Sequence, residues 1–251
     1  RKSAAVVALT GSFKENLTQR GVNGNKIAVV INGIDVSRYG PRPRDADLAS
    51  QWNLEGRFVV GYVGTHGMAH GLRNVLNAAE LLRDETDFRF LLVGSGAERQ
   101  ELFEEAMDRR LNNVVFMPPQ AKENMPAVWS LCDVALAHLK DSPVFAGVIP
   151  SKIFEAMGMG LPLLLAAPEG EASRIIFEDR VGVCVPAEDP EALAKAALDL
   201  MKNEKKRRAF SQNSLKAAPL HSRERQARLM MNVLELAARG KGGQAGLAVS
   251  S

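Results

Sequence analysis

Residues 88–109 read FRFLLVGSGAERQELFEEAMDR, which is an apolar strand, a glycine turn and a helix in succession. The run from Phe88 to Val93 is almost continuously apolar, as in strands that are buried on both faces of a parallel sheet. Glycines at positions 94 and 96 permit a tight turn, and Glu98 to Arg109 show a helical pattern. The stretch therefore predicts one strand–helix unit of a parallel α/β sheet.

The same alternation runs along most of the chain. The expected strands are residues 4–9, 27–31, 58–63, 88–93, 114–117, 134–137, 163–166 and 183–185, and the expected helices include 72–82, 98–109, 125–131, 153–159 and 191–201. Short apolar strands separated by helices indicate βαβ units. We therefore predict an α/β fold, and the six strands from Phe58 onward match the number in a Rossmann-like sheet.

The chain divides where its composition changes. Asn32-Gly33 is a turn signal, and the polar, proline-rich residues 39–44 are typical of a linker. We predict that residues 1–36 are the last strand–helix unit of a preceding domain with its hinge, and that 37–217 form the Rossmann-like domain. A C-terminal helix over 218–239 and a disordered Gly/Ser/Ala-rich tail over 240–251 complete the expected order.

Bulk properties set limits on function. With 46% hydrophobic residues in a chain of 251, a sizeable core is possible, and a net charge of +3 is too small to indicate nucleic-acid binding. Cys132 and Cys184 are expected to be buried thiols of a reducing compartment. We expect a cytoplasmic location for a chain cut from a longer one, and we favour a solvated face for the basic run 202–208 over contact with an anionic membrane surface.

Ligands of open parallel sheets bind at the carboxyl ends of the strands, so the loops there are candidate sites. Gly64-Thr65-His66-Gly67 follows one expected strand, and Gly94 follows the next. Glycines in such turns allow a ligand to approach the backbone, and equally allow close strand–helix packing. Neither loop matches a dinucleotide fingerprint or a P-loop.

The densest candidate site is the stretch from Pro150 to Glu155. Ser151 is expected to be the N-cap of a short helix that ends at Gly160. Glu155 then lies in the first turns, where a carboxylate can accept both hydroxyls of a ribose, while N–H groups near Ser151 face a phosphate. The alternative is that Glu155 only complements the helix dipole and Lys152 is solvated.

Three motifs in this order carry a family resemblance. They are residues 30–35 (VINGID), 92–96 (LVGSG) and 152–162 (KIFEAMGMGLP). Together they resemble the family 4 (group 1) retaining glycosyltransferases of the GT-B fold. The resemblance implies a donor-binding C-terminal domain, one half of a GT-B fold, with a remnant of the N-terminal acceptor domain.

The resemblance also implies site residues and a donor. Glu155 would bind the nucleotide ribose, and the donor phosphates would meet the glycine loops and helix ends without an essential metal. The wording of residues 150–155, with Gly170-Glu171 downstream, is similar to the branch that transfers N-acetylaminosugars in bacterial surface-polysaccharide assembly. A UDP-sugar is the implied donor, with no other cofactor.

Two positions depart from the family pattern. Gly147, followed by Val148, stands where the family usually has a second glutamate, and we include both residues in the expected donor site. The Arg/Lys pair that often follows the first strand of this domain is absent. His66, His70, Arg73 or Lys152 are the candidate substitutes, and no catalytic residue is assigned.

The expected function is retaining transfer of a sugar from a UDP-sugar to a glycan or lipid-linked acceptor. The acceptor domain would be a required partner, so this chain alone is expected to bind UDP with little or no turnover. A location on the inner face of the cytoplasmic membrane is compatible with such acceptors. The alternatives are a sugar-nucleotide epimerase of the same fold and a non-catalytic partner subunit, which Gly147 and the missing cations favour.

Overall fold

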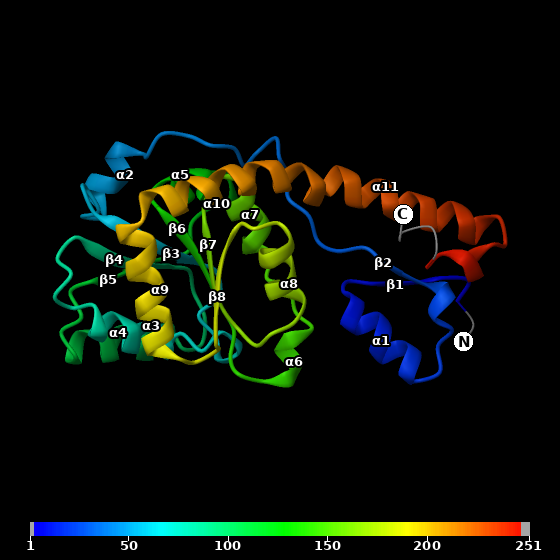
Figure 1. The fold of residues 1–251 in the computed structure, drawn as a ribbon, viewed down its shortest axis with the longest axis horizontal. Coiled ribbons are helices and arrows are strands. Elements are labelled where there is room, and N and C mark those ends of the chain that lie inside the picture. The colour runs from blue at the N-terminus through cyan, green and yellow to red at the C-terminus, as the bar shows by residue number, and fades with distance from the viewer. Residues whose placement is uncertain (1–2, 247–251) are drawn as a thin grey trace.

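The larger part of the molecule is built around a six-stranded parallel sheet (Figure 1). The computed structural model describes residues 3–246. In spatial order the strands are β5 (Val114–Met117), β4 (Phe88–Val93), β3 (Phe58–Val63), β6 (Val134–His138), β7 (Leu163–Ala166) and β8 (Gly182–Val185). All five ladders are parallel, and this order is that of a Rossmann sheet. The predicted α/β fold is confirmed.

Helices cover both faces of this sheet. One face carries α3 (Arg73–Leu81), α4 (Arg99–Asp108) and α9 (Pro190–Lys202), and the other carries α2 (Ala46–Gln51), α5 (Met125–Ser130), α7 (Lys152–Gly158) and α8 (Glu171–Glu178). Successive strand residues enter opposite cores: Leu91 and Val93 pack on the α7 side, and Phe90 and Leu92 on the α3 side. Burial on both faces explains why the strands are continuous apolar runs.

A second, two-stranded parallel sheet lies beside the first. It consists of β1 (Val6–Ala8) and β2 (Ile27–Val29), with α1 (Gly11–Gln19) between them. We call residues 3–31 the N-terminal unit. The 3-10 segment η1 (Gly24–Lys26) leads into β2.

The C-terminal helices connect the two sheets. After α10 (Glu204–Ala217) and the 3-10 turn η4 (Ala218–His221), α11 (Arg223–Ala238) runs across to the N-terminal unit (Figure 1). The outgoing chain is hydrogen-bonded to the returning one, since Ile34 N donates to His221 O and Arg223 N donates to Ile34 O. A side chain at Gly33 would lie 2.6 Å from His221 O, so only glycine fits this crossing.

Several local features differ from expectation. Residues 242–246 fell within the predicted disordered tail, but Gly242–Gln244 form the 3-10 turn η5, and Ala245 packs with Ala28 and Val233. Composition misses this because the contacts are supplied by distant segments; residues 247–251 lie outside the described part. Tyr39, in the expected linker, is buried in the main core. The loop after β6 contains α6 (Pro143–Ala146). The domain boundaries stay predictions.

The N-terminal unit also contacts the ligand edge of the main sheet. Glu171, in the first turn of α8, accepts hydrogen bonds from Ser12 N (2.6 Å) and Ser12 Oγ (2.9 Å). Glu171 is 9% exposed as a residue, and its carboxylate satisfies an N–H at the start of α1 that no helical carbonyl reaches. Gly147 packs against the same serine. These contacts hold α1 against the start of α8 and against the loop after β6.

We expect Glu171→Ala to release α1. A hydrogen bond to a charged group contributes about 1.5–3 kcal/mol, and about 1.4 kcal/mol corresponds to a tenfold change. Amide hydrogen exchange at Ser12 should therefore accelerate roughly ten- to hundredfold. Glu178→Ala, on the exposed end of the same helix, is the matched control and should leave this exchange rate unchanged. Equal exchange rates in both variants would show that the contact does not hold α1.

Candidate functional site

A cavity of about 430 Å³ opens between the carboxyl end of β3 and the start of α7, the helix that closes the segment after β6. The strand order reverses between β3 and β6, which is where open α/β sheets bind ligands. Six of its lining residues belong to the predicted site: Gly64, Thr65, Pro150, Ser151, Lys152 and Glu155. The others are Tyr39, Val63, His70, Gln120, Lys122 and Met125. The structure thus brings the β3 loop and the start of α7 together around one space.

A smaller adjoining cavity of about 210 Å³ extends this space toward β4. It shares Gly64 and Thr65 and adds Gly94 and Ser95. The β3 and β4 loops are joined by hydrogen bonds from Gly64 N to Val93 O (2.9 Å) and from His66 N to Ser95 O (2.8 Å). A side chain at Gly94 would lie 1.9 Å from Gly64 O, so close approach of the loops requires glycine. Together the two cavities form an elongated groove.

Glu155 lines the larger cavity from α7. Its Oε2 accepts a hydrogen bond of 3.1 Å from Nε1 of the fully buried Trp129. A carboxylate has about four acceptor positions, so this bond orients the group and leaves capacity for further donors. The geometry suits recognition of two neighbouring hydroxyls.

Lys152 presents an amine to the same cavity. Its stem is partly exposed, but Nζ is buried and has no hydrogen-bond partner among residues 3–246. Nζ lies 3.4 Å from the centre of the Tyr62 ring, and a side chain at Gly64 would approach Nζ to 2.8 Å. Burial lowers the pKa of Lys152 to about 7, with Glu155 acting in the opposite direction.

Three histidines surround this amine. Burial, followed by the charges of Arg99 and Lys152, lowers the pKa of His66 to about 4, and burial lowers that of His138 to about 4. Burial and the Lys152 charge also lower the pKa of His70. Uncharged imidazoles are therefore expected around Lys152 at neutral pH.

His66 is not placed as expected for a ligand-binding side chain. It is fully buried between Tyr62 and Phe116, with ring centres 5.9 and 6.3 Å away. Only its backbone takes part in joining the β3 and β4 loops. The third histidine of this group, His70, does line the cavity.

Other predicted residues lie away from the groove. Gly67 precedes the 3-10 turn η2 (Met68–His70) and lines neither cavity. Gly147 and Val148 lie at the end of α6, where Gly147 packs on Ser12. Ser151 stands at the predicted N-cap position of α7, but its own backbone is helical and its side chain makes no capping hydrogen bond.

Trp129, Tyr39 and Lys122 contribute to the site without a sequence signal for that role. Trp129 lies in an apolar helical pattern that indicates only core, yet its N–H holds Glu155. Tyr39 was hidden in a linker-like segment, and burial together with the Glu155 charge raises its pKa to about 12. Lys122 belongs to the 3-10 turn η3 (Lys122–Asn124), and no local pattern predicts that it reaches the cavity.

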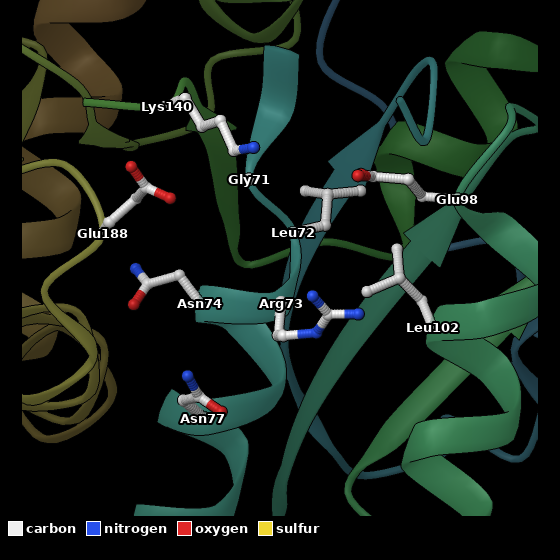
Figure 2. Close-up of a pocket in the computed structure, with 9 residues that line it drawn as sticks. All are labelled: Gly71, Leu72, Arg73, Asn74, Asn77, Glu98, Leu102, Lys140 and Glu188. Carbon is white, nitrogen blue, oxygen red and sulfur yellow. The ribbon is translucent and has the colours of Figure 1, made fainter. Parts of the chain in front are cut away.

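A further cavity of about 270 Å³ lies beyond Gly71, at the start of α3 (Figure 2). Figure 2 shows Lys140 and Arg73 on its walls together with Glu98 and Glu188, so positive and negative side chains are balanced. Arg73, a candidate substitute for the missing cations, is already paired with Glu101 and Glu105 of α4. This cavity is therefore a weaker candidate for a polyanionic ligand.

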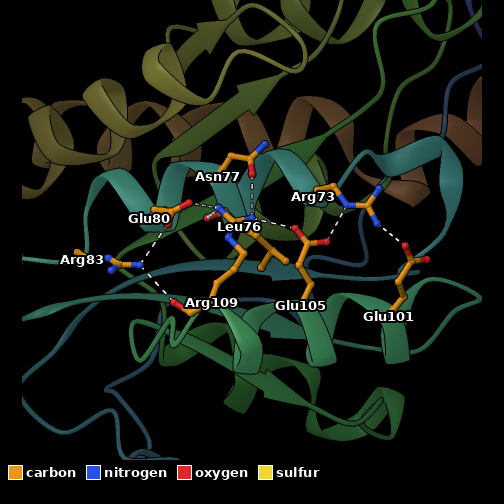
Figure 3. Close-up of polar contacts among 8 residues, drawn as sticks. All are labelled: Arg73, Leu76, Asn77, Glu80, Arg83, Glu101, Glu105 and Arg109. Carbon is orange, nitrogen blue, oxygen red and sulfur yellow. Dashed lines mark hydrogen bonds and ion pairs between the residues drawn. The ribbon is translucent and has the colours of Figure 1, made fainter.

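An ion-pair network holds α3 against α4 (Figure 3). Arg109 pairs with Glu80 and with Glu105 (2.8 Å), and donates to Asn77 Oδ1 (2.9 Å). The loops that precede these helices, after β3 and β4, carry Gly64 and Gly94. The network thus supports the spacing of the two loops that form one edge of the groove.

No group of three or more potential metal ligands is found within residues 3–246. Among the same residues, no helix combines the length and apolar character needed to span a bilayer.

Comparison with known proteins identifies relatives over most of the chain. The family described as glycosyl transferases group 1 matches residues 44–217. WcaI of Escherichia coli K12, named as a candidate glycosyl transferase of colanic acid biosynthesis, is 29% identical over 219 residues, covering 84% of this chain and 53% of that protein. O-antigen chain mannosyltransferase C of Escherichia coli is 30% identical over 184 residues, covering 70% and 47%. The chain spans about half the length of these curated relatives.

Solved structures share the fold. Alr3699/HepE of Anabaena, in complex with UDP and glucose, matches with a TM-score of 0.80 at 21% identity, covering 92% of this chain and 63% of that one. At this identity the likeness concerns the fold, and it places the chain among GT-B structures.

Loss of the Arg109 guanidinium should destabilise the groove's scaffold. The Arg109 side chain is 21% exposed and bonds to two helices, so Arg109→Ala should lower the free energy of unfolding by about 2 kcal/mol. Arg83→Ala is the matched control, because Arg83 is 49% exposed and should cost no more than about 0.5 kcal/mol. Urea denaturation measures both, and equal losses would contradict the assigned role of the network.

Proposed function

The chain belongs to the group 1 glycosyl transferases, and we propose that it is the donor-binding part of an enzyme that transfers a sugar from a UDP-sugar. The acceptor would be a glycan or lipid-linked saccharide of cell-surface polysaccharide synthesis. The observation that carries the proposal is the groove at the strand-order reversal, where an oriented carboxylate and a buried amine face one space. The names of the relatives support the pathway, and the solved neighbour with UDP supports the donor class.

The ribose and the diphosphate of the donor each have a matching feature in the groove. The Glu155 carboxylate, held by Trp129, accepts hydrogen bonds from the two ribose hydroxyls. The diphosphate lies toward Gly64, where the absence of a side chain allows close approach. The neighbouring space lined by Gly94 and Ser95 leaves room for a further part of the donor beside the β4 loop.

The reaction breaks the bond between the anomeric carbon and the diphosphate oxygen, and negative charge develops on the leaving group. Preorganised donors that stabilise such charge lower the barrier. In this proposal the chain's own polar groups supply that stabilisation, transfer proceeds with retention and without a metal, and the acceptor is bound by a partner domain. The donor sugar is proposed to be an N-acetylaminosugar, because the sequence of residues 150–155 is similar to the branch that transfers such sugars.

A second candidate function is a non-catalytic partner that binds the donor without using it. Gly147 favours it, because this position carries no carboxylate and packs against Ser12 instead of lining the groove. The two candidates are separated by incubating the full-length protein with UDP-sugar and acceptor, since only the transferase consumes donor.

The ribose assignment predicts the effect of a single substitution. Glu155→Ala removes two charge-assisted hydrogen bonds, each worth about 1.5–3 kcal/mol. Calorimetric titration with UDP should therefore show affinity reduced by a factor of a hundred or more. Trp129→Phe keeps the carboxylate but loses the bond that orients it, and should produce a smaller loss.

Glu169→Ala is the matched control, because Glu169 is an exposed carboxylate of the β7 loop that lines neither part of the groove. It should bind UDP as the unchanged chain does. A parallel titration with GDP compares the affinity for a guanine nucleotide with that for a uracil nucleotide. Unchanged UDP affinity in a folded Glu155→Ala protein would rule out the ribose assignment.

A further inference from the structure

We propose that Lys152 is the cation that neutralises the donor diphosphate, and that it takes up a proton when the diphosphate binds. This inference rests on the proposed function and deepens it, since it couples donor affinity to pH. It assigns the role of the absent Arg/Lys pair after β3 to a residue that reaches the same place from α7.

The first support is the unmet bonding capacity of Lys152. An ammonium group has three donors, and Nζ has no hydrogen-bond acceptor among the described residues although it is buried. Nζ lies over the face of the Tyr62 ring, 3.4 Å from the ring centre. A buried polar group in this condition is costly unless a ligand completes its bonds. The amine lines the groove that the diphosphate is proposed to enter.

The second support is the position of Nζ relative to Gly64. A side chain at Gly64 would lie 2.8 Å from Nζ. The lysine amine therefore lies close to the backbone of the β3 loop at this glycine. A diphosphate that approaches the Gly64 backbone therefore comes within reach of Nζ.

Competing cations are less well placed. Of the residues that line the larger cavity, Lys152 and Lys122 are the lysines and no arginine is present. Lys122 is exposed on its turn, whereas Arg73 is committed to Glu101 and Glu105. Lys152 is the cation whose charge solvent screens least, so it gains most from a bound anion.

The charge state of the empty site follows from its surroundings. Burial lowers the pKa of Lys152 to about 7, and the Glu155 carboxylate opposes this shift. The adjacent histidines have lowered pKa values, and burial raises the pKa of Tyr62 and Tyr39. Above pH 7.5 these five groups stay uncharged, so Lys152 is the member of the cluster that changes charge.

The direction of the pH effect follows from linkage. A bound diphosphate favours the ammonium form and raises the pKa of Lys152, so binding takes up a proton wherever the empty site holds the neutral amine. Affinity is then constant below the pKa of the empty site and falls about tenfold per pH unit above it. The terminal phosphate of UDP ionises near pH 6, so it adds no pH dependence above 7.5.

Calorimetry with UDP on the intact chain tests the inference. Between pH 7.5 and 9.5 the affinity should fall by roughly a hundredfold. At pH 8.5, titrations in two buffers of different ionisation enthalpy should show uptake of about one proton per UDP bound. Lys152→Arg carries a permanent charge, so its binding should not vary with pH and should involve no proton uptake.

Lys152→Met should bind UDP at least tenfold more weakly at pH 7.5 and should lose the pH dependence, while Lys216→Met, an exposed control on α10, should behave as the unchanged chain. Failure of the unchanged chain to bind UDP at any pH would overturn the proposed function. UDP binding that depends on Glu155 but shows no proton uptake and no change in Lys152→Met would overturn this inference alone. If Lys152→Met does not fold, the two-buffer result on the unchanged chain decides.

Discussion

The site depends on how closely the ends of β3 and β4 approach each other. Gly64 and Gly94 both have a φ of +147°, and the carbonyl of Gly64 occupies the space where a side chain at Gly94 would lie. Two loops that each begin with a glycine therefore form one edge of the groove, and α7 closes the other with Lys152 and Glu155. Any side chain at either glycine would push the loops apart or displace the Lys152 amine.

In this fold the buried strands form the apolar cores, and the loops at the strand ends carry the polar groups. Both faces of the six-stranded sheet are occupied by apolar cores, so polar ligand groups must come from the strand ends. The amine of Lys152 and the indole N–H of Trp129 are exceptions, because these two polar groups of the site are buried. The low-dielectric surroundings of Lys152 strengthen its interaction with an anion, whereas the indole N–H acts by orienting Glu155.

Much of this arrangement is predictable from the sequence, for identifiable reasons. The strands of the main sheet are continuous apolar runs between turn signals, and the shared edge of a parallel sheet brings residues 64, 94 and 150–155 together. Long-range burial was not predictable. Lys152 follows a serine at a helix start, where a solvated side chain is the ordinary expectation, but tertiary packing places its amine against Tyr62 and Gly64. His66 sits in a loop at the ligand edge but is enclosed by Tyr62 and Phe116.

The proposed site places Glu155 against the ribose and Lys152 against the diphosphate of one UDP molecule. A crystal structure of this chain with UDP tests it most directly. We expect the ribose hydroxyls to lie against the Glu155 carboxylate and a phosphate oxygen to lie within hydrogen-bond distance of Lys152 Nζ, beside Gly64. UDP bound instead in the cavity lined by Arg73 and Lys140 would contradict it.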